Sequence, residues 1–427
     1  MPEGSQVRCR PVKNWYALSL KDPKSNWFGN TSVGSWFHKV VVRGKNGGLY
    51  SASTSDDETQ LLVIFACVIA ALAQELPLAE ECDAAKCKLP DCRCSGTDIP
   101  GGFEPHRIPQ FVLLTFDDAV TIGNIDTYRS LLVGRRNFNK CQIGTTFFVS
   151  HEYTDYRLLN ELYSNGFEIA LHSISHQSQD YFRNADKELL RKEFADQKTI
   201  ITNFGAIPAD SIQGIRMPFL QMAGNVSFEV MKEAGLRYDL SMPTTQFDYP
   251  GMWPYTLDYA STQDCISGPC PTASLPGLWA IPMVAWTDLA QFKCAMVDAC
   301  FSSPADDDTE GWFRFIVQNF ERHYLGNRAP FGFYVHEGPV RTRPGLRAAL
   351  VRFLDMLSTM NDVALVTPSE LLDWVQNPVS LSDYLQKPCR EVTLGRRCRP
   401  VTCELLNLNN CLRCPRVYPW LGNPLGE

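Results

Sequence analysis

A chain of 427 residues, of which 44% are hydrophobic and 11% aromatic, carries enough apolar side chains to build a large buried core. The length accommodates a catalytic domain of about 250 residues, the typical size of an α/β barrel, with extensions to spare. The formal net charge is −7 and no basic block stands out, so we do not expect a nucleic-acid-binding protein.

The first 73 residues divide into two parts. Residues 1–60 are mostly polar, and we interpret them as an atypical leader or a mis-joined exon. Residues 61–73, LLVIFACVIAALA, resemble the apolar core of a signal peptide and are shorter than the ~20 residues that span a bilayer. The SDDETQ before them is acidic where a signal peptide is basic, so a signal anchor is the alternative. We expect a secreted, extracellular protein with no membrane span in its mature form.

Sixteen cysteines are many for a chain of this size, and fourteen of them follow residue 81. Most of the fourteen lie in clusters at 82–94, 265–300 and 389–414. An even number of clustered cysteines predicts up to seven disulfides formed in an oxidising compartment. The alternative is a zinc ribbon made from four cysteines of the last cluster: Cys398, Cys403, Cys411 and Cys414.

Between residues 105 and 378 the chain alternates between apolar strand-like runs and amphipathic helical patterns, and we expect the catalytic domain there. A Cys-rich cap at 74–104 precedes it, and a Cys-rich tail at 379–427 follows. The alternation predicts a (β/α) barrel of seven or eight strands, with a doubly wound open sheet as the alternative. Residues 241–300 interrupt the pattern, and we interpret them as long loops over the barrel mouth.

The predicted strands share an apolar or β-branched composition, and several predicted helices end at a glycine, the usual C-terminal stop signal. The strands are expected at 111–116, 145–149, 167–171, 212–216, 236–240, 278–286, 331–335 and 363–366, and the helices at 156–165, 187–204, 228–234, 312–325, 346–359 and 368–375.

Two adjacent aspartates, Asp117 and Asp118, follow the first predicted strand of the barrel. Neighbouring strand residues face opposite sides, so both carboxylates reach one site only where the strand ends. Catalytic residues of a (β/α) barrel lie at such strand ends. The alternative is a turn in which the carboxylates cap backbone N–H groups.

His172 and His176 follow the predicted strand 167–171. One helical turn places residues i and i+4 on the same face, a spacing that lets two imidazoles bind one metal ion. One aspartate would complete a site with open positions, which suits Zn²⁺, although cobalt, nickel or iron also accept these ligands. The other aspartate is then free to act as a general base. The alternative is a structural pair of histidines bonded to loop carbonyls.

Four segments, TFDDAV, HSISH, GIRMPFL and YVH, follow one another along the chain and resemble the successive motifs of the polysaccharide deacetylases with NodB homology (carbohydrate esterase family 4). KLPDCRCSGTDIPGG, MWPYTLDY and APFGFYVHEG resemble the insect chitin deacetylases in particular. The resemblance runs from about Cys82 to Leu372. It implies a distorted (β/α)7-8 barrel of the polysaccharide deacetylase type, with long disulfide-bridged loops and Cys-rich N- and C-terminal extensions.

The resemblance also implies roles for the residues of the first three motifs. Asp117 would be the general base, and Asp118, His172 and His176 would be the metal ligands. Arg216, in GIRMPFL, would pair with Asp117 and aim it, although a plain strand-end salt bridge is the alternative.

Four later residues complete the implied site. His336, in YVH, would be the general acid, since histidine titrates near neutral pH. Asp239 would support His336, with a turn cap as the alternative. Trp253 would wall the acetyl pocket and Tyr255 would offer an apolar face to a sugar ring, although both could equally be core residues.

The reaction implied by the resemblance is metal-dependent hydrolysis of the N-acetyl groups of chitin (poly-N-acetylglucosamine). The short architecture, with no added chitin-binding module, resembles the gut-associated members of the family. This resemblance implies action on chitin or chito-oligosaccharides in the gut lumen or peritrophic matrix, and we expect a monomer. The alternatives are a deacetylase of another acetylated polysaccharide and a chitin-binding matrix organiser with little turnover.

Overall fold

The chain divides into two units, Met1–Pro77 and Leu78–Glu427. In the first unit, β1 (Arg10–Pro11), β2 (His38–Arg43) and β3 (Leu49–Thr54) form an antiparallel sheet with the order β1-β3-β2. The apolar segment predicted at 61–73 lies outside the described residues. The computed structural model describes residues 10–11, 38–43, 49–54, 76–391 and 397–427.

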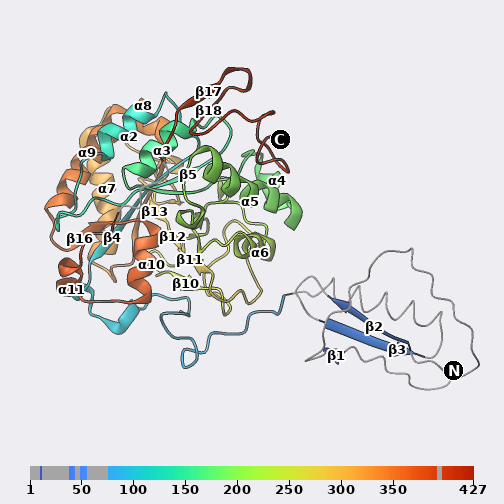
Figure 1. The fold of residues 1–427 in the computed structure, drawn as a ribbon. Helices are drawn as coiled ribbons and strands as arrows, with labels where there is room; N and C mark the ends of the chain where they lie inside the picture. Colours follow the sequence, from blue (N-terminus) through green and yellow to red (C-terminus); the bar gives the residue numbers. More distant parts are fainter. Residues whose placement is uncertain (1–9, 12–37, 44–48, 55–75, 392–396) are drawn as a thin grey trace, which may run out of the picture. The chain divides into compact units, whose positions relative to one another are not determined.

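The second unit is built on a nine-stranded sheet with helices around it (Figure 1). Its strand order is β10-β11-β8-β7-β6-β5-β4-β15, and β16 also pairs with β4. Neighbouring strands are parallel except for β10 and β11, which are antiparallel. The strands are β4 (Gln110–Asp117), β5 (Thr146–Val149), β6 (Glu168–Leu171), β7 (Gly214–Ile215), β8 (Tyr238–Asp239), β10 (Tyr255–Thr256), β11 (Trp279–Ala280), β15 (Phe331–His336) and β16 (Val363–Leu365).

The sheet is curled into part of a barrel. Strands β4 and β7 are separated by two other strands, which on a flat sheet would hold them about 14 Å apart. Nevertheless, the side chain of Arg216, directly after β7, contacts Thr115 and Asp117 of β4. This curl confirms the distorted (β/α) barrel prediction and disagrees with a flat, doubly wound sheet.

Helices cover the outside of the sheet, and α7 lies beside α9 as α5 lies beside α6 (Figure 1). Helix α5 begins and ends where the sequence predicts, because the Asp186 side chain caps it and Gly205 follows its last residue. Four helices, α2, α4, α8 and α11, lie outside the predicted ranges. The helices are α2 (Ile125–Leu132), α3 (Tyr156–Ser164), α4 (Gln179–Arg183), α5 (Lys187–Phe204), α6 (Asn225–Glu233), α7 (Thr309–Tyr324), α8 (Glu337–Thr342), α9 (Pro344–Thr359), α10 (Pro368–Gln376) and α11 (Leu381–Gln386).

The strand predicted at 278–286 is wrong in its extent. Pro282 falls within it and has no N–H for a strand ladder, so the run breaks into short pieces. Strand β11 belongs to the main sheet, β12 (Met283–Val284) pairs with β9 (Pro243–Thr244), and β13 (Trp286–Thr287) pairs with β14 (Lys293–Cys294).

Seven disulfides join all fourteen cysteines that follow residue 81, as predicted. The zinc-ribbon alternative is wrong, because its four cysteines form two disulfides with one another. Cys141, outside the predicted clusters, bonds to Cys389 and ties the C-terminal tail to the barrel. The bonds are Cys82–Cys94, Cys87–Cys92, Cys141–Cys389, Cys265–Cys270, Cys294–Cys300, Cys398–Cys411 and Cys403–Cys414.

Within the described part of the chain, none of the helices combines the length and the apolar character needed to cross a membrane.

Candidate active site

The carboxyl ends of β4 and β15 meet at one edge of the sheet. Asp117 is the last residue of β4, His336 is the last residue of β15, and the two are partners in the parallel register. Registered partners project their side chains on the same face of a sheet. The register therefore brings together two residues that lie 219 positions apart in the sequence.

Asp118 continues past the strand end in an unusual backbone conformation. Its φ is 81°, and its N–H donates to the carbonyl oxygen of Phe148 at 3.0 Å. A positive φ is uncommon for a residue other than glycine and breaks the alternation of the strand. Asp117 stays almost completely buried, whereas the Asp118 side chain is 48% exposed.

His172 and His176 lie close to Asp118. The Nε2 atom of His172 is 3.9 Å from the Asp118 Oδ1 atom, and that of His176 is 3.5 Å from the same oxygen. One ligand atom from each of the three residues lies within 4.8 Å of the others. Two imidazoles and one carboxylate are a common zinc ligand set, so the donor atoms present fit a divalent metal ion.

The His172 ring is held in the tautomer that a metal ligand requires. Its Nδ1 atom lies 2.8 Å from the backbone carbonyl oxygen of Arg216, which can only accept. Nδ1 therefore carries the proton and the Nε2 lone pair faces Asp118. Burial lowers the pKa of His172 to about 4, which keeps the ring neutral at pH 7.

The two histidines lie on a loop between β6 and α4, and not on the single helical turn that the spacing suggested. Ser173 and His176 both have positive φ, of 73° and 43°. The loop curls because the His176 N–H donates to Ser173 Oγ at 3.1 Å. A tight loop thus brings the rings together, with centroids 5.0 Å apart.

Glu193, a buried residue of α5, holds the middle of this loop. The backbone N–H groups of Ile174 and Ser175 donate to its Oε2 atom at 2.9 and 3.0 Å. The hydroxyls of Ser175 and Tyr181 donate to its Oε1 atom. Nothing in the sequence marks Glu193 as a site residue, since a Glu inside an amphipathic helix looks like any exposed residue.

Arg216 and Asp117 form a buried ion pair. Arg216 Nη1 is 2.5 Å from Asp117 Oδ1 and donates to Thr115 Oγ1 at 2.8 Å, while Nε donates to the carbonyl oxygen of Leu240. The guanidinium carbon lies 4.1 Å from the centroid of the Phe148 ring. These contacts fix the direction of the Asp117 carboxylate.

His336 is paired with Asp298, and the prediction that Asp239 supports it is wrong. The Nδ1 atom of His336 donates to Asp298 Oδ2 at 2.7 Å, and its Nε2 atom lies 3.9 Å from Asp118 Oδ2. Burial alone would lower the pKa of His336, but the hydrogen bond and charge of Asp298, together with Asp117 and Asp118, raise it to about 9.

Asp239 has a local role. Its two carboxylate oxygens accept hydrogen bonds from the hydroxyl and the N–H of Ser241, at 2.6 and 3.1 Å. Ser241 Oγ in turn accepts from the Met217 N–H. Burial raises the pKa of Asp239 to about 6. Asp239 is thus a turn cap, the alternative to a role in supporting His336.

Trp253 and Tyr255 are core residues, so the structure gives neither a face toward substrate. Trp253 is fully buried and stacks on Trp374 with ring centroids 5.7 Å apart. Tyr255 is 1% exposed and donates to Gln263. The aromatic ring beside the metal-ligand group belongs to Phe219 in GIRMPFL, which is half exposed and 4.9 Å from the His176 ring.

The combination of an incomplete (β/α) barrel with a His/His/Asp group at its strand ends is typical of hydrolases that bind a metal ion. The polysaccharide deacetylase family model matches residues 106–238. Chitin deacetylase 8 of Bombyx mori is 54% identical over 370 residues, which is 84% of this chain and 97% of that protein. The chain belongs to the polysaccharide deacetylase family.

Two further proteins are similar to this chain to a lesser degree. Chitin deacetylase 1 of Bombyx mori is 37% identical over 380 residues, covering 82% of this chain and 69% of that protein. The structure of the chitin deacetylase from Colletotrichum lindemuthianum superposes with a TM-score of 0.34 at 11% identity, over 62% of this chain and 88% of that one.

Proposed function

We propose that this protein is a metal-dependent chitin deacetylase, which hydrolyses the N-acetyl groups of chitin to acetate and free amines. The observation that carries the proposal is that Asp117 and His336, a base and an acid, are register partners beside Asp118. The similarity to Chitin deacetylase 8 over nearly its whole length supports chitin as the substrate.

Asp118, His172 and His176 would hold the metal ion, and their ligand types favour Zn²⁺. When bound, this ion polarises the acetyl carbonyl group and makes the attacking water more acidic. Asp118 and His176 are partly exposed, which leaves room on the solvent side for water and substrate.

Asp117 is the proposed general base. It accepts the proton of the water molecule as the water oxygen bonds to the acetyl carbon. The ion pair with Arg216 keeps its carboxylate in one orientation, so that the remaining oxygen can face the water.

His336 is the proposed general acid. An amine is a poor leaving group unless it is protonated, so the C–N bond breaks as His336 Nε2 donates a proton to the nitrogen. Asp298 accepts from Nδ1 and stabilises the protonated ring that this step requires. The products are acetate and the sugar amine.

The protein would act outside the cell on chitin or chito-oligosaccharides, as a monomer, in the gut lumen or the peritrophic matrix. Seven disulfides support an extracellular location, because they persist in oxidising environments.

Acetate release from chitin oligomers tests this function. Zinc-loaded protein should release acetate, and chelator treatment should abolish the release until zinc is restored. The same assay with acetylated xylan and peptidoglycan distinguishes the other polysaccharide substrates. Chitin binding without chelator-sensitive acetate release from any of these glycans would contradict the proposal and favour a matrix organiser.

A further inference from the structure

Asp298 has a single side-chain partner in the described structure, and that partner is His336. Its Oδ2 atom accepts from His336 Nδ1, while its Oδ1 atom is buried without a hydrogen-bond partner among the described residues. A carboxylate with one hydrogen bond cannot fix its own position. The backbone that carries Asp298 must therefore place it against the imidazole.

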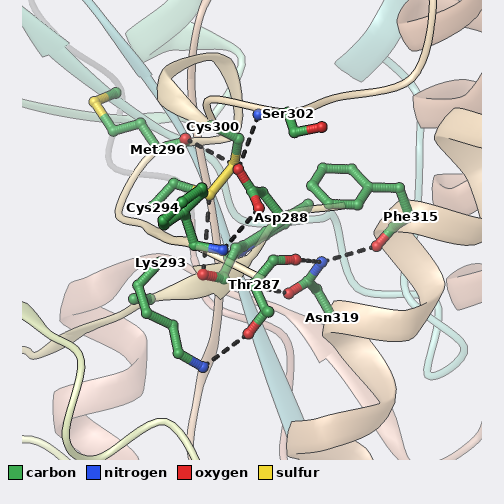
Figure 2. The surroundings of a disulfide bond; sticks show 12 residues. Thr287, Asp288, Lys293, Cys294, Met296, Cys300, Ser302, Phe315 and Asn319 are labelled. Carbon is green, nitrogen blue, oxygen red and sulfur yellow. Dashed lines mark hydrogen bonds between the residues drawn. A yellow bond between two sulfur atoms is a disulfide. The ribbon is translucent and has the colours of Figure 1, made fainter. Parts of the chain in front are cut away.

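That backbone is a closed loop, residues 288–302, which we call the Asp298 loop. Strand β13 leads into it and pairs with β14, which lies within the loop, and the 3-10 helix η5 (Val297–Ala299) carries Asp298. The disulfide Cys294–Cys300 spans η5 and makes a small covalent ring of this segment (Figure 2). The ring restricts the conformations of the segment that carries Asp298.

Asp288 fastens the two ends of the Asp298 loop to each other. It is 2% exposed, and its Oδ1 atom accepts from the N–H groups of Ala290 and Phe292, each at 2.8 Å. Its Oδ2 atom accepts from the N–H of Ser302, on the returning segment, at 2.8 Å (Figure 2). One carboxylate thus closes the loop at its base, while the disulfide closes it near its tip.

The base of the loop is in turn fixed to the barrel. The indole Nε1 of Trp286 donates to the carbonyl oxygen of Gly332 in β15 at 2.8 Å, so the hairpin is attached to the strand that ends in His336. Asn319 of α7 accepts from the Thr287 N–H at 2.8 Å and donates to the Thr287 carbonyl oxygen at 3.2 Å (Figure 2). The Asp298 loop and His336 are therefore both attached to β15.

We propose that Asp288 and the Cys294–Cys300 disulfide are positioning groups for the general acid, which act by placing Asp298 on His336. This inference rests on the proposed deacetylase function. Neither group contacts the residues of the metal site in the described structure. Their loss should therefore impair proton donation to the leaving group and leave metal binding and water attack in place.

Leaving-group chemistry separates this role from a merely structural one. An amide needs a protonated nitrogen to break, whereas 4-nitrophenyl acetate releases a phenolate that leaves without a proton. Zinc-loaded wild type and variants would be compared on chitin oligomers and on this ester, with zinc affinity measured by calorimetry. The variants are Asp288→Asn and the double variant Cys294→Ser/Cys300→Ser.

We expect each variant to lose about 10- to 100-fold in kcat on chitin oligomers, part of the 10²–10⁴-fold that a general acid typically supplies. The KM for the oligomers, the ester rate and the zinc dissociation constant should stay within about threefold of wild type. In Asp288→Asn, an amide NH2 group replaces one carboxylate oxygen. This group cannot accept the backbone N–H hydrogen bonds that the oxygen accepts, so the loop should lose part of its closure.

Two matched controls exist in the chain. Asp264 is another loop-capping carboxylate that accepts backbone N–H groups, from Thr245 and Gln246, so Asp264→Asn repeats the chemistry away from His336. Cys87→Ser/Cys92→Ser removes a disulfide of nearly the same span as Cys294–Cys300. Both controls should keep the wild-type ratio of amide to ester turnover.

Unchanged kcat on chitin oligomers in both variants, equal losses on both substrates, or weakened zinc binding would overturn the inference. If Asp288→Asn does not fold, the cysteine double variant alone decides the question. A zinc-loaded wild type that releases no acetate from chitin would contradict the proposed function itself, which is a different result from an altered ratio in the variants.

Discussion

His172 and Arg216 are joined by a hydrogen bond of 2.8 Å from the Nδ1 atom of the histidine to the backbone carbonyl oxygen of the arginine. The Arg216 side chain meanwhile binds Asp117. One residue therefore orients a proposed metal ligand through its backbone and the proposed base through its side chain. Because a substitution removes only the side chain, the two roles can be separated.

Arg216→Met should destabilise the fold while sparing metal affinity. Removing one partner of a buried ion pair leaves Asp117 with an uncompensated charge, which typically costs about 3–5 kcal/mol at pH 7. Urea denaturation measures this loss, and zinc calorimetry should show little change. The double variant Arg216→Met/Asp117→Asn should recover part of the stability. An Arg216→Met protein as stable as wild type would contradict the importance of the pair.

Asp117→Asn should lower kcat for acetate release by about 10²–10⁴-fold, because an amide cannot accept the proton of the attacking water. Zinc affinity should remain near that of wild type. Asp118→Asn serves as the comparison, since loss of the proposed ligand should weaken zinc binding itself. Retained full activity of Asp117→Asn would remove this residue from the role of base.

Glu193→Ala should weaken zinc binding about 10- to 100-fold, the usual effect of losing a group that orients metal ligands. The variant removes the acceptor for the backbone of the loop between His172 and His176. Glu193→Gln keeps one carbonyl oxygen for these N–H groups and should be milder. Glu188→Ala, an exposed position in the same helix, is the control. Equal zinc affinity in all three variants would show that the loop keeps its shape without Glu193.

Acid should destabilise the protein through two buried histidines outside the active site. Burial lowers the pKa of both His151 and His323 from 6.5 to about 4. As the pH falls below 6.5, the unfolded chain binds these protons before the folded protein does. Stability is therefore complete above pH 6.5 and declines as the pH approaches 4, by about 2 kcal/mol per histidine at pH 5.

Denaturation curves at pH 7 and pH 5 check the acid effect. In His323→Asn, the amide can still donate to the Ala329 carbonyl oxygen but does not titrate. Its loss of stability between the two pH values should be smaller than that of wild type by about 2 kcal/mol. The same loss in both proteins would show that His323 does not contribute to the acid sensitivity.

Local sequence was sufficient to identify the residues at the strand ends. One apolar run is followed by Asp117-Asp118, and another is followed by His172 and His176. The pattern of apolar and polar residues is enough to predict two strands that end in polar side chains. The spacing of the two histidines suggested a helical turn, but Glu193 and the positive φ of Ser173 hold them on a loop. The spacing of two histidines along the sequence limits the distance between their rings, but it does not determine whether the backbone between them is a helix or a loop.

Only the tertiary structure shows which side chains become hydrogen-bond partners across distant parts of the chain. The prediction paired His336 with Asp239, whereas the folded loop supplies Asp298, and nothing in the local pattern around Asp298 marks it except the two nearby cysteines. Likewise, the sequence does not show whether Trp253 and Tyr255 line the cleft or belong to the core. Burial depends on what else packs against a side chain, and that is set by the fold.

By itself, the sequence determined the barrel class and the cysteine chemistry, because strand periodicity and cysteine count are properties of short segments. The proposed ligands and base rest on the resemblance of four short motifs to those of the family. The curl of the sheet, the Asp298–His336 pair and the closure of its loop were decided by tertiary structure. The placement of His336 beside Asp117 depends on two strands 219 residues apart, whose register is fixed only when the strands pair. The Asp298–His336 pair and the loop closure join residues 38 and 14 positions apart, and they depend on the irregular path that the chain takes between them.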